Sequence, residues 1–379
     1  MTLARARRAF SRFYAMLMKE FIQLRRDRVT LATMISVPLM QLFLFGFAIN
    51  TTPRDLPTAV LLQENTDVGR SILAALRNTA FFDIRKVATS EAEVEHLLRS
   101  GAVLFVVEIP AGFERALRRG ETPAMLVSAD ATDPVAAGSA LGALEGVVQS
   151  ALSRDRVTGV GPPAQPPFEI RQHRRFNPAG SSQLNIVPGL LGTILTMTML
   201  IFTALSVTRE VERGTMESLL AMPIRPLEIM LGKIAPYVVV GFLQATLIVS
   251  AGLFVFGVPM LGNLGLLALL STLFIAANLS IGYTFSTLAQ NQLQAVQMAM
   301  MFFLPNILLS GFMFPFAGMP AWAQWIGECL PLTHYIRIVR GIMLKGADLG
   351  DLQHDGVWLV GLMLIAMTIA VRRFRQTLD

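Results

Sequence analysis

Charged side chains of both signs alternate in one short segment, Arg209–Glu228, which reads REVERGTMESLLAMPIRPLE. The spacing predicts a helix over Arg209–Ala221 with one charged face and one apolar face, the latter formed by Val211, Met216, Leu219 and Leu220. Met222-Pro223 should end this helix, because proline cannot continue it. Such a helix could bind a soluble partner through ion pairs on its charged face and apolar contacts on the other face, and the partner could then push on it.

Residues for bond-making chemistry are missing. The phosphate-binding loop of ATPases needs glycines, then lysine, then serine or threonine. The chain has four lysines, and the residues that follow them are Glu20, Val87, Ile234 and Gly346. The four histidines form no HExxH pair, and the single cysteine, Cys329, excludes an internal disulfide framework. We therefore expect a chain that is not an enzyme and that binds no cofactor or metal.

The composition indicates a polytopic membrane protein. Hydrophobic residues make up 53% of the chain and charged residues only 15%, and the hydrophobic ones gather in long runs. A helix needs about 20 apolar residues to cross a bilayer. Six runs satisfy this, the last with help from flanking arginines that reach the interface: 29–49, 186–207, 234–257, 264–289, 295–316 and 357–371. The net charge is +6, and the basic residues that produce it cluster beside these runs, which favours a membrane over a nucleic acid as the partner.

The six predicted spans contain no Asp, Glu, Lys, Arg or His. Carriers driven by protons or sodium usually need such residues at membrane depth, so their absence argues against a secondary antiporter and against an intramembrane protease. Gln41, Asn278 and Asn306 are candidates to line a translocation path. The alternative is that these amides form hydrogen bonds between packed helices.

Residues 1–28 predict a basic amphipathic helix at the membrane surface, since arginines alternate with Phe10, Phe13, Leu17 and Phe21 at helical spacing. A signal peptide is the alternative, but the apolar run 29–49 is too long for one and lacks a small-residue cleavage site.

Residues 50–185 predict an α/β domain inserted after the first span. Strand-like runs at 58–63, 82–87, 103–109 and 124–128 alternate with helix-like runs at 68–78, 90–99, 112–119 and 134–153. The last of these helices could be a projecting arm, although a core helix fits its apolar spacing better. The segment 159–167, GVGPPAQPP, predicts a stiff connector back to the membrane.

The short loops predict the topology. Lys and Arg flank the membrane at 1–28, at 208–233 and in the tail 372–379, so these segments should lie in the cytoplasm with both termini. The α/β domain and the segment 317–355 should then be extracytoplasmic. In that segment Trp322 and Trp325 suit a membrane interface, and Thr333–Lys345 predicts a short amphipathic helix there. Ser310-Gly311 and Pro315 interrupt the apolar run before it, which suggests that the end of that span is broken or re-entrant.

These features together resemble the permeases of type 2 ABC transporters, particularly bacterial exporters with a large extracytoplasmic domain after the first span. The resemblance covers nearly the whole chain. Its most specific part is the GTxE-xLL-xxP element between the second and third spans. The residues that carry it in that loop are Glu210, Glu212, Arg213, Gly214, Thr215, Glu217, Leu219, Leu220, Pro223 and Glu228, and Lys19-Glu20 and Arg26-Asp27 precede the first span.

The resemblance implies a subunit that exports amphiphilic or drug-like substrates with energy from a separate ABC ATPase, which binds ATP and Mg. Arg209–Met222 would be the coupling helix on that ATPase, together with Glu228, and Lys19, Glu20, Arg26 and Asp27 would belong to an elbow helix beside it. Further implied partners are a second permease copy or paralogue and the lipid bilayer, with a periplasmic adaptor as another candidate, in a bacterial inner membrane.

Four alternatives stand beside this hypothesis. The loop could be an ordinary charged connection that only fixes topology, and the N-terminal helix could serve only as a lipid anchor. The whole chain could be a secondary multidrug carrier, or a membrane-anchored scaffold or receptor whose α/β domain binds an envelope partner.

Overall fold

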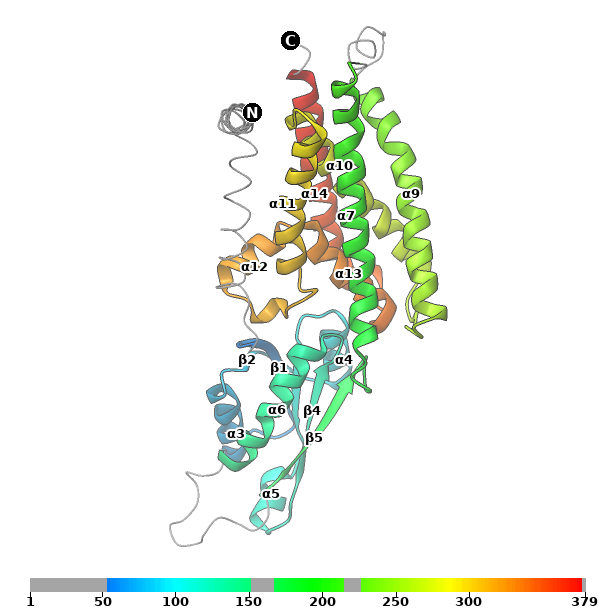
Figure 1. Cartoon of the computed structure of the whole chain (residues 1–379). Helices are drawn as coiled ribbons and strands as arrows, with labels where there is room; N and C mark the ends of the chain where they lie inside the picture. Colours follow the sequence, from blue (N-terminus) through cyan, green and yellow to red (C-terminus); the bar gives the residue numbers. More distant parts are fainter. Residues whose placement is uncertain (1–52, 151–166, 215–225, 377–379) are drawn as a thin grey trace, which may run out of the picture.

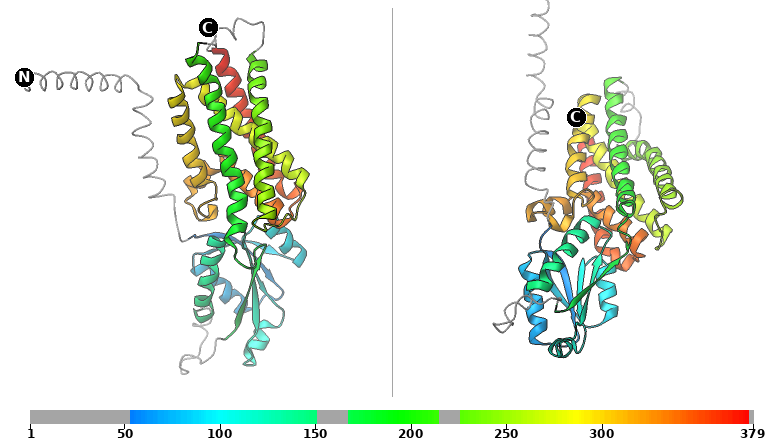
Figure 2. Two further views of the ribbon diagram at one scale, coloured as in Figure 1. Left: turned by 45° about the vertical axis from the view of Figure 1, so that its right-hand side comes forward. Right: turned by 60° about the horizontal axis from the view of Figure 1, so that its bottom comes forward.

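The computed structural model describes residues 53–150, 167–214 and 226–376. In this part of the chain an α/β domain lies at one end of an elongated molecule and a bundle of long helices extends from it (Figure 1). Figure 2 shows the same two parts from two further sides. The predicted first span, 29–49, lies outside the described residues.

A mixed five-stranded sheet forms the centre of the α/β domain, in the order β2-β1-β3-β4-β5. β1 is parallel to β2 and β3, β3 is antiparallel to β4, and β4 is parallel to β5. The strands are β1 (Leu56–Leu62), β2 (Phe82–Ala88), β3 (Phe105–Ile109), β4 (Ala124–Asp130) and β5 (Glu169–Arg175). This arrangement confirms the predicted α/β domain.

Helices cover both faces of the sheet. α3 (Asp67–Asn78) and α6 (Pro134–Ser150) pack on one face through residues such as Ile72, Leu76 and Leu144. α4 (Glu91–Arg99) packs on the other face through Val94, Leu97 and Leu98. The buried side of α6 confirms the prediction that it is a core helix. The short α5 (Phe113–Arg118) lies at the end of the domain farthest from the bundle (Figure 1).

Local capping begins these helices where the sequence predicts them. The Thr66 hydroxyl accepts a hydrogen bond from the Gly69 N–H at 3.2 Å and caps α3. Ser90 caps α4 in the same way, and the Glu93 carboxylate accepts from the Thr89 N–H at 2.9 Å. Each bond satisfies a donor that the first helical turn cannot pair internally.

The bundle contains five helices that are long and apolar enough to cross a membrane. They are α7 (Ser182–Glu212), α9 (Pro226–Phe254), α10 (Leu264–Leu288), α11 (Gln292–Leu309) and α14 (Leu349–Gln376). These are the predicted spans after the first, with shifted ends: α14 begins eight residues before 357, and α11 ends at Leu309 rather than 316. The chain turns at Ser310-Gly311 after α11, where the sequence predicted an interruption.

α10 is the central helix of the bundle and packs against α7, α9, α11 and α14. Its contact with α7 is close at Gly282, because a Cβ there would lie 2.9 Å from the Leu200 carbonyl oxygen. Small residues let membrane helices approach in this way.

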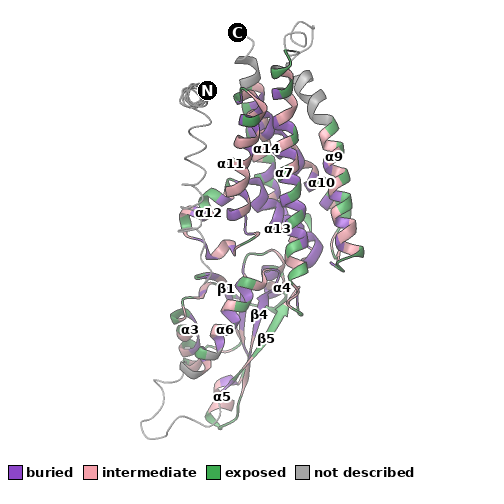
Figure 3. Cartoon of the chain, viewed as in Figure 1, coloured by how far each residue is buried: buried purple, intermediate pink, exposed green. Residues whose placement is uncertain are grey.

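Three short elements connect α11 to α14: the 3-10 turn η2 (Phe316–Gly318), α12 (Ala321–Glu328) and α13 (Pro331–Lys345). The predicted helix over Thr333–Lys345 is present as α13, which is buried against α7, α10 and α14. The ring of Tyr335 stacks on Phe274 of α10 with centroids 3.9 Å apart, and its hydroxyl lies 2.7 Å from that of Ser271. Figure 3 shows this burial in the middle of the molecule.

Candidate coupling site and buried ionic layer

The predicted coupling residues fall on either side of the end of the described α7. Arg209, Glu210 and Glu212 lie in its last turn, and Arg213 and Gly214 form the turn that follows. Glu228 belongs to the first turn of α9, where side chains are not described. The remaining predicted site residues lie outside the described residues: Thr215, Glu217, Leu219, Leu220 and Pro223, with Lys19, Glu20, Arg26, Asp27 and Gln41.

The structure corrects the predicted helix over Arg209–Ala221. Residues 209–212 continue the membrane helix α7, and the helix ends at Glu212. Gly214 then adopts φ of +67°, a left-handed conformation that commonly terminates helices and that glycine takes without strain. The predicted helix is therefore interrupted at Arg213-Gly214, and its remaining part, 215–221, lies outside the described residues.

Glu212 binds another helix of the same chain. Its Oε1 accepts a hydrogen bond from the backbone N–H of Gln292 at 2.7 Å, and its Oε2 accepts one from the Gln292 side-chain amide. Gln292 is the first residue of α11, 80 positions away, and Asn291 caps the same helix end by accepting from the Gln294 N–H at 2.8 Å. These donors, the Gln292 side chain first, lower the pKa of Glu212. The carboxylate thus ties the end of α7 to the start of α11.

Removing this carboxylate should loosen the start of α11. In a Glu212→Ala variant the amides of Gln292–Gln294 should exchange with deuterium several-fold faster, because the Gln292 N–H loses its acceptor. Hydrogen exchange measured by mass spectrometry on the purified chain tests this. Glu212→Gln is the matched control, because its amide oxygen can still accept from the backbone. Equal exchange in Glu212→Ala and the parent would contradict the assignment.

A second link joins the same end of α7 to α10. The Thr208 N–H donates to the Ser286 hydroxyl at 3.1 Å, and both side chains are buried. α7 therefore connects to α10 through Thr208 and to α11 through Glu212. A displacement of the turn at Arg213-Gly214 would reach both helices.

The predicted path residues lie inside the packed bundle. Asn278 of α10 is fully buried and donates to the Phe274 carbonyl of its own helix at 3.0 Å. Asn306 of α11 is also fully buried, and its amide makes no hydrogen bond to any described residue. In the described chain neither amide bonds to another helix. By contrast, Thr198 of α7 donates to the Gln244 side-chain oxygen of α9 at 2.8 Å.

A layer of buried charge lies where the bundle meets the α/β domain. Lys345 at the end of α13 pairs with Asp130 at the end of β4, and their side chains are 8% and 2% exposed. Arg99 of α4 pairs with Asp351 of α14 at 3.1 Å. Arg340 of α13 donates to the Gly311 carbonyl at 3.2 Å and to the Asn185 side chain. This layer was not predicted from the sequence, because its partners are distant along the chain: Lys345 and Asp130 lie 215 positions apart, and Arg99 and Asp351 are farther apart still.

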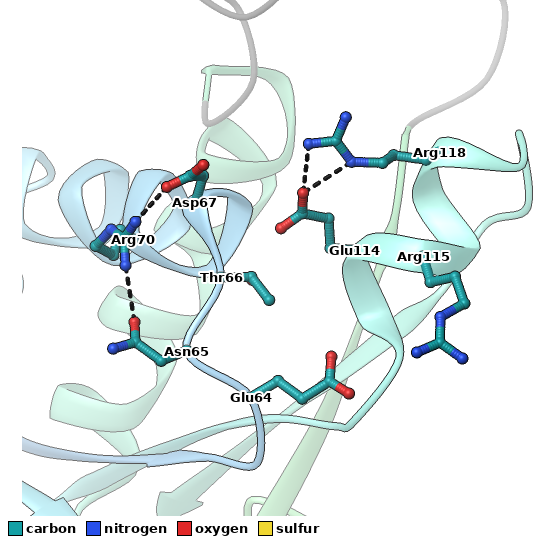
Figure 4. A pocket seen from close by; sticks show the side chains of 8 residues that line it. All are labelled: Glu64, Asn65, Thr66, Asp67, Arg70, Glu114, Arg115 and Arg118. Carbon is teal, nitrogen blue, oxygen red and sulfur yellow. Dashed lines mark hydrogen bonds and ion pairs between the residues drawn. The ribbon is translucent and has the colours of Figure 1, made fainter.

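A polar recess opens at the far end of the α/β domain, beside the ends of β1 and β3 (Figure 4). Its volume is about 470 Å³. Arg118 donates to Glu114 at 2.8 Å, and Arg70 donates to Asn65 at 3.0 Å and pairs with Asp67. The residues that line the recess are Glu64, Asn65, Thr66, Asp67, Arg70, Glu114, Arg115 and Arg118. Their charges balance, and two of the three arginines bind other residues of the lining.

Comparison with known proteins finds similarity along almost the whole chain. The family described as ABC-2 family transporter protein matches residues 28–372. The probable multidrug ABC transporter permease YbhS of Escherichia coli K12 is 31% identical over 340 residues, which are 89% of this chain and 90% of that protein. YbhR, a second probable multidrug ABC transporter permease of the same strain, is 28% identical over 92% of this chain and 94% of its own length. The inner membrane transport permease YhhJ of that strain is 28% identical over 90% of this chain and 93% of its own.

Proposed function

The chain belongs to the ABC-2 family of transporter proteins, and from this premise we propose that it uses ATP hydrolysis by a partner subunit to export amphiphilic or drug-like molecules. It is a permease subunit, and in ABC transporters the ATPase and its bound ATP belong to other subunits. The observation that carries the proposal is the family match over 28–372, which takes in the described bundle and the loop after α7.

We propose six spans, with 29–49 added to the five described helices, and with both termini in the cytoplasm. The last turns of α7 and α14 lie at the same end of the bundle, opposite the α/β domain (Figure 1). Arg209, Arg213 and Arg372 lie at that end, and positive charge beside a span favours the cytoplasmic side. The α/β domain would then be extracytoplasmic, within reach of a periplasmic adaptor.

The segment 215–223 is the proposed contact with the ATPase, with the elbow residues beside it. Because α7 ends at Glu212 and is joined there to α10 and α11, a push on this segment would move three spans together. This gives Glu212 a role inside the permease, where the sequence suggested a direct bond to the ATPase.

The proposed surroundings are lipid and a second permease unit. Val239, Leu243 and Leu247 of α9 recur at four-residue spacing and are 66–70% exposed. An apolar stripe of this kind suits lipid or another apolar helix surface. YbhS and YbhR are both permeases of one organism, which supports a paralogue as well as an identical copy for the second unit. The name of YbhS, probable multidrug ABC transporter permease, supports drug-like substrates, and that of YhhJ, inner membrane transport permease, supports an inner membrane.

Purification from native membranes tests the function. The tagged chain in mild detergent should carry with it an ATPase that has a phosphate-binding loop, and the complex should hydrolyse ATP while the isolated chain should not. The matched control replaces 215–223 with a glycine-serine linker of equal length, which should remain in the membrane and lose the ATPase. Nucleotide turnover by the isolated chain, or a complex that survives the replacement, would contradict the proposal.

A further inference from the structure

Four charged side chains meet where α12, α13 and α14 converge. Glu328 ends α12, His334 and Arg337 belong to α13, and Asp355 lies in the second turn of α14. The side chain of His334 is 0% exposed and that of Asp355 is 14% exposed, whereas Glu328 and Arg337 are about one-third exposed. These four residues form what we term the α13–α14 cluster.

Hydrogen-bond geometry determines where the protons of His334 lie. Its Nε2 is 2.9 Å from the backbone carbonyl oxygen of Glu328, which can only accept, so Nε2 carries a hydrogen. Its Nδ1 is 2.7 Å from Oδ1 of Asp355. Two bare acceptors at this distance would repel, so a second proton must lie between these atoms. The pair therefore holds one proton more than a neutral imidazole and a carboxylate would.

The neighbouring groups place this second proton on the imidazole. The guanidinium of Arg337 forms ion pairs with Asp355 at 3.4 Å and with Glu328 at 2.6 Å. With His334 protonated, two cations face two anions and the cluster is neutral. The indole of Trp358 lies parallel to the His334 ring, with centroids 5.6 Å apart, an arrangement that favours a cation over the ring face.

Within the described part of the chain, α10, α11 and η2 add no further charge against His334. α10 and α11 contain no acidic or basic side chain, and Phe316 of η2 covers Arg337 with its ring centroid 4.5 Å from the guanidinium carbon. On α14, His354 contacts the edge of Trp358 and does not contact His334. Among the residues that the structure describes, the titratable groups in contact with His334 or its indole neighbour are Glu328, Arg337, Asp355 and His354.

We propose that His334 and Asp355 form a proton-binding site, in which the bound proton is the ligand that joins the start of α14 to α13. Loss of the proton leaves the cluster with one excess negative charge and removes the bond between Nδ1 and Oδ1. The start of α14 then keeps the ion pair of Asp355 with Arg337 but loses its hydrogen bond to His334, so its joint with α13 loosens. The proton site depends only on the described side chains. Its consequence, that extracytoplasmic pH acts on this joint, rests on the proposed topology.

The test compares the full-length chain with its Asp355→Asn variant. In the parent at about neutral pH, nitrogen NMR of the purified protein should show both ring nitrogens of His334 carrying hydrogen. In Asp355→Asn the ring should lose one of these hydrogens, because the asparagine N–H can donate to a neutral Nδ1. A His334→Gln spectrum assigns the signals, and His173→Gln, at an exposed position of β5, is the control. A neutral His334 ring in the parent would overturn the proposal.

Cys329, the chain's single cysteine, is exposed and directly follows Glu328. A probe can therefore be attached beside the cluster without introducing a cysteine. A spin label attached there should become more mobile in the parent as the pH rises from about 6 to about 9. The label in Asp355→Asn should keep the same mobility across this range, because its cluster is neutral without the proton. Equal pH responses in both proteins would refute the role of the proton in the joint. This readout requires neither ATPase nor transport, so its failure would leave the proposed function standing.

Discussion

A Leu219→Pro variant is expected to lose ATP-dependent export by roughly tenfold or more while it still inserts in the membrane. The sequence predicts helix at Leu219, and proline there removes a backbone N–H and clashes with the preceding turn, at about 3 kcal/mol or more. The proposed contact with the ATPase should therefore be deformed. The change leaves the turn at Gly214 and the bonds of Glu212 and Thr208 in place.

Transport in membrane vesicles with and without ATP measures this effect, and the amount of chain in the membrane is measured in parallel. Leu219→Met is the matched control, because methionine preserves apolar contact and helix propensity. Export by Leu219→Pro at the parent's rate would show that 215–223 does not transmit the work of the ATPase.

A Lys345→Met variant should be destabilised by about 3–5 kcal/mol, the usual loss when one partner of a buried ion pair is removed. Asp130, whose side chain is 2% exposed, would keep its charge, and among the described residues Thr132 alone would still donate to its carboxylate. Thermal unfolding of the purified chain in detergent measures the change. The Lys345→Met/Asp130→Asn double variant should recover much of the loss, because the unpaired charge is gone.

Lys86 provides the control for this experiment. It lies exposed on β2 of the same domain, so Lys86→Met should change stability by no more than about 0.5 kcal/mol. If Lys345→Met proved as stable as Lys86→Met, the junction between the α/β domain and the bundle would not depend on the pair with Asp130.

The long apolar runs predicted the bundle because membrane helices must be apolar on nearly all sides. Strands β1–β4 were predicted because their buried residues are apolar and β-branched. β5 was missed for the opposite reason: its sequence EIRQHRR has no buried residue, since it lies at an edge of the sheet. Its pairing with β4 depends on backbone hydrogen bonds, which leave no mark on side-chain pattern.

The site was less predictable than the fold. Thr333–Lys345 was predicted as an amphipathic helix, but the burial of its His334, Arg337, Arg340 and Lys345 was not, because such residues are rarely buried without partners. The partners come from α12, α14, β4 and the start of α7, so only the folded chain shows that these charges are satisfied. Glu212 was assigned to a partner protein on a motif, and the amide it binds lies 80 positions away.

Both borders of the sheet carry arginine or lysine: Arg85 and Lys86 on β2, and Arg171, Arg174 and Arg175 on β5. The free backbone groups of an edge strand can pair with a strand of another molecule, and positive charge along the edge disfavours this pairing. Two neighbouring copies would therefore repel at these margins, so a continuous ten-stranded ribbon across an assembly is disfavoured. At high local concentration such domains would therefore stay separate and resist aggregation.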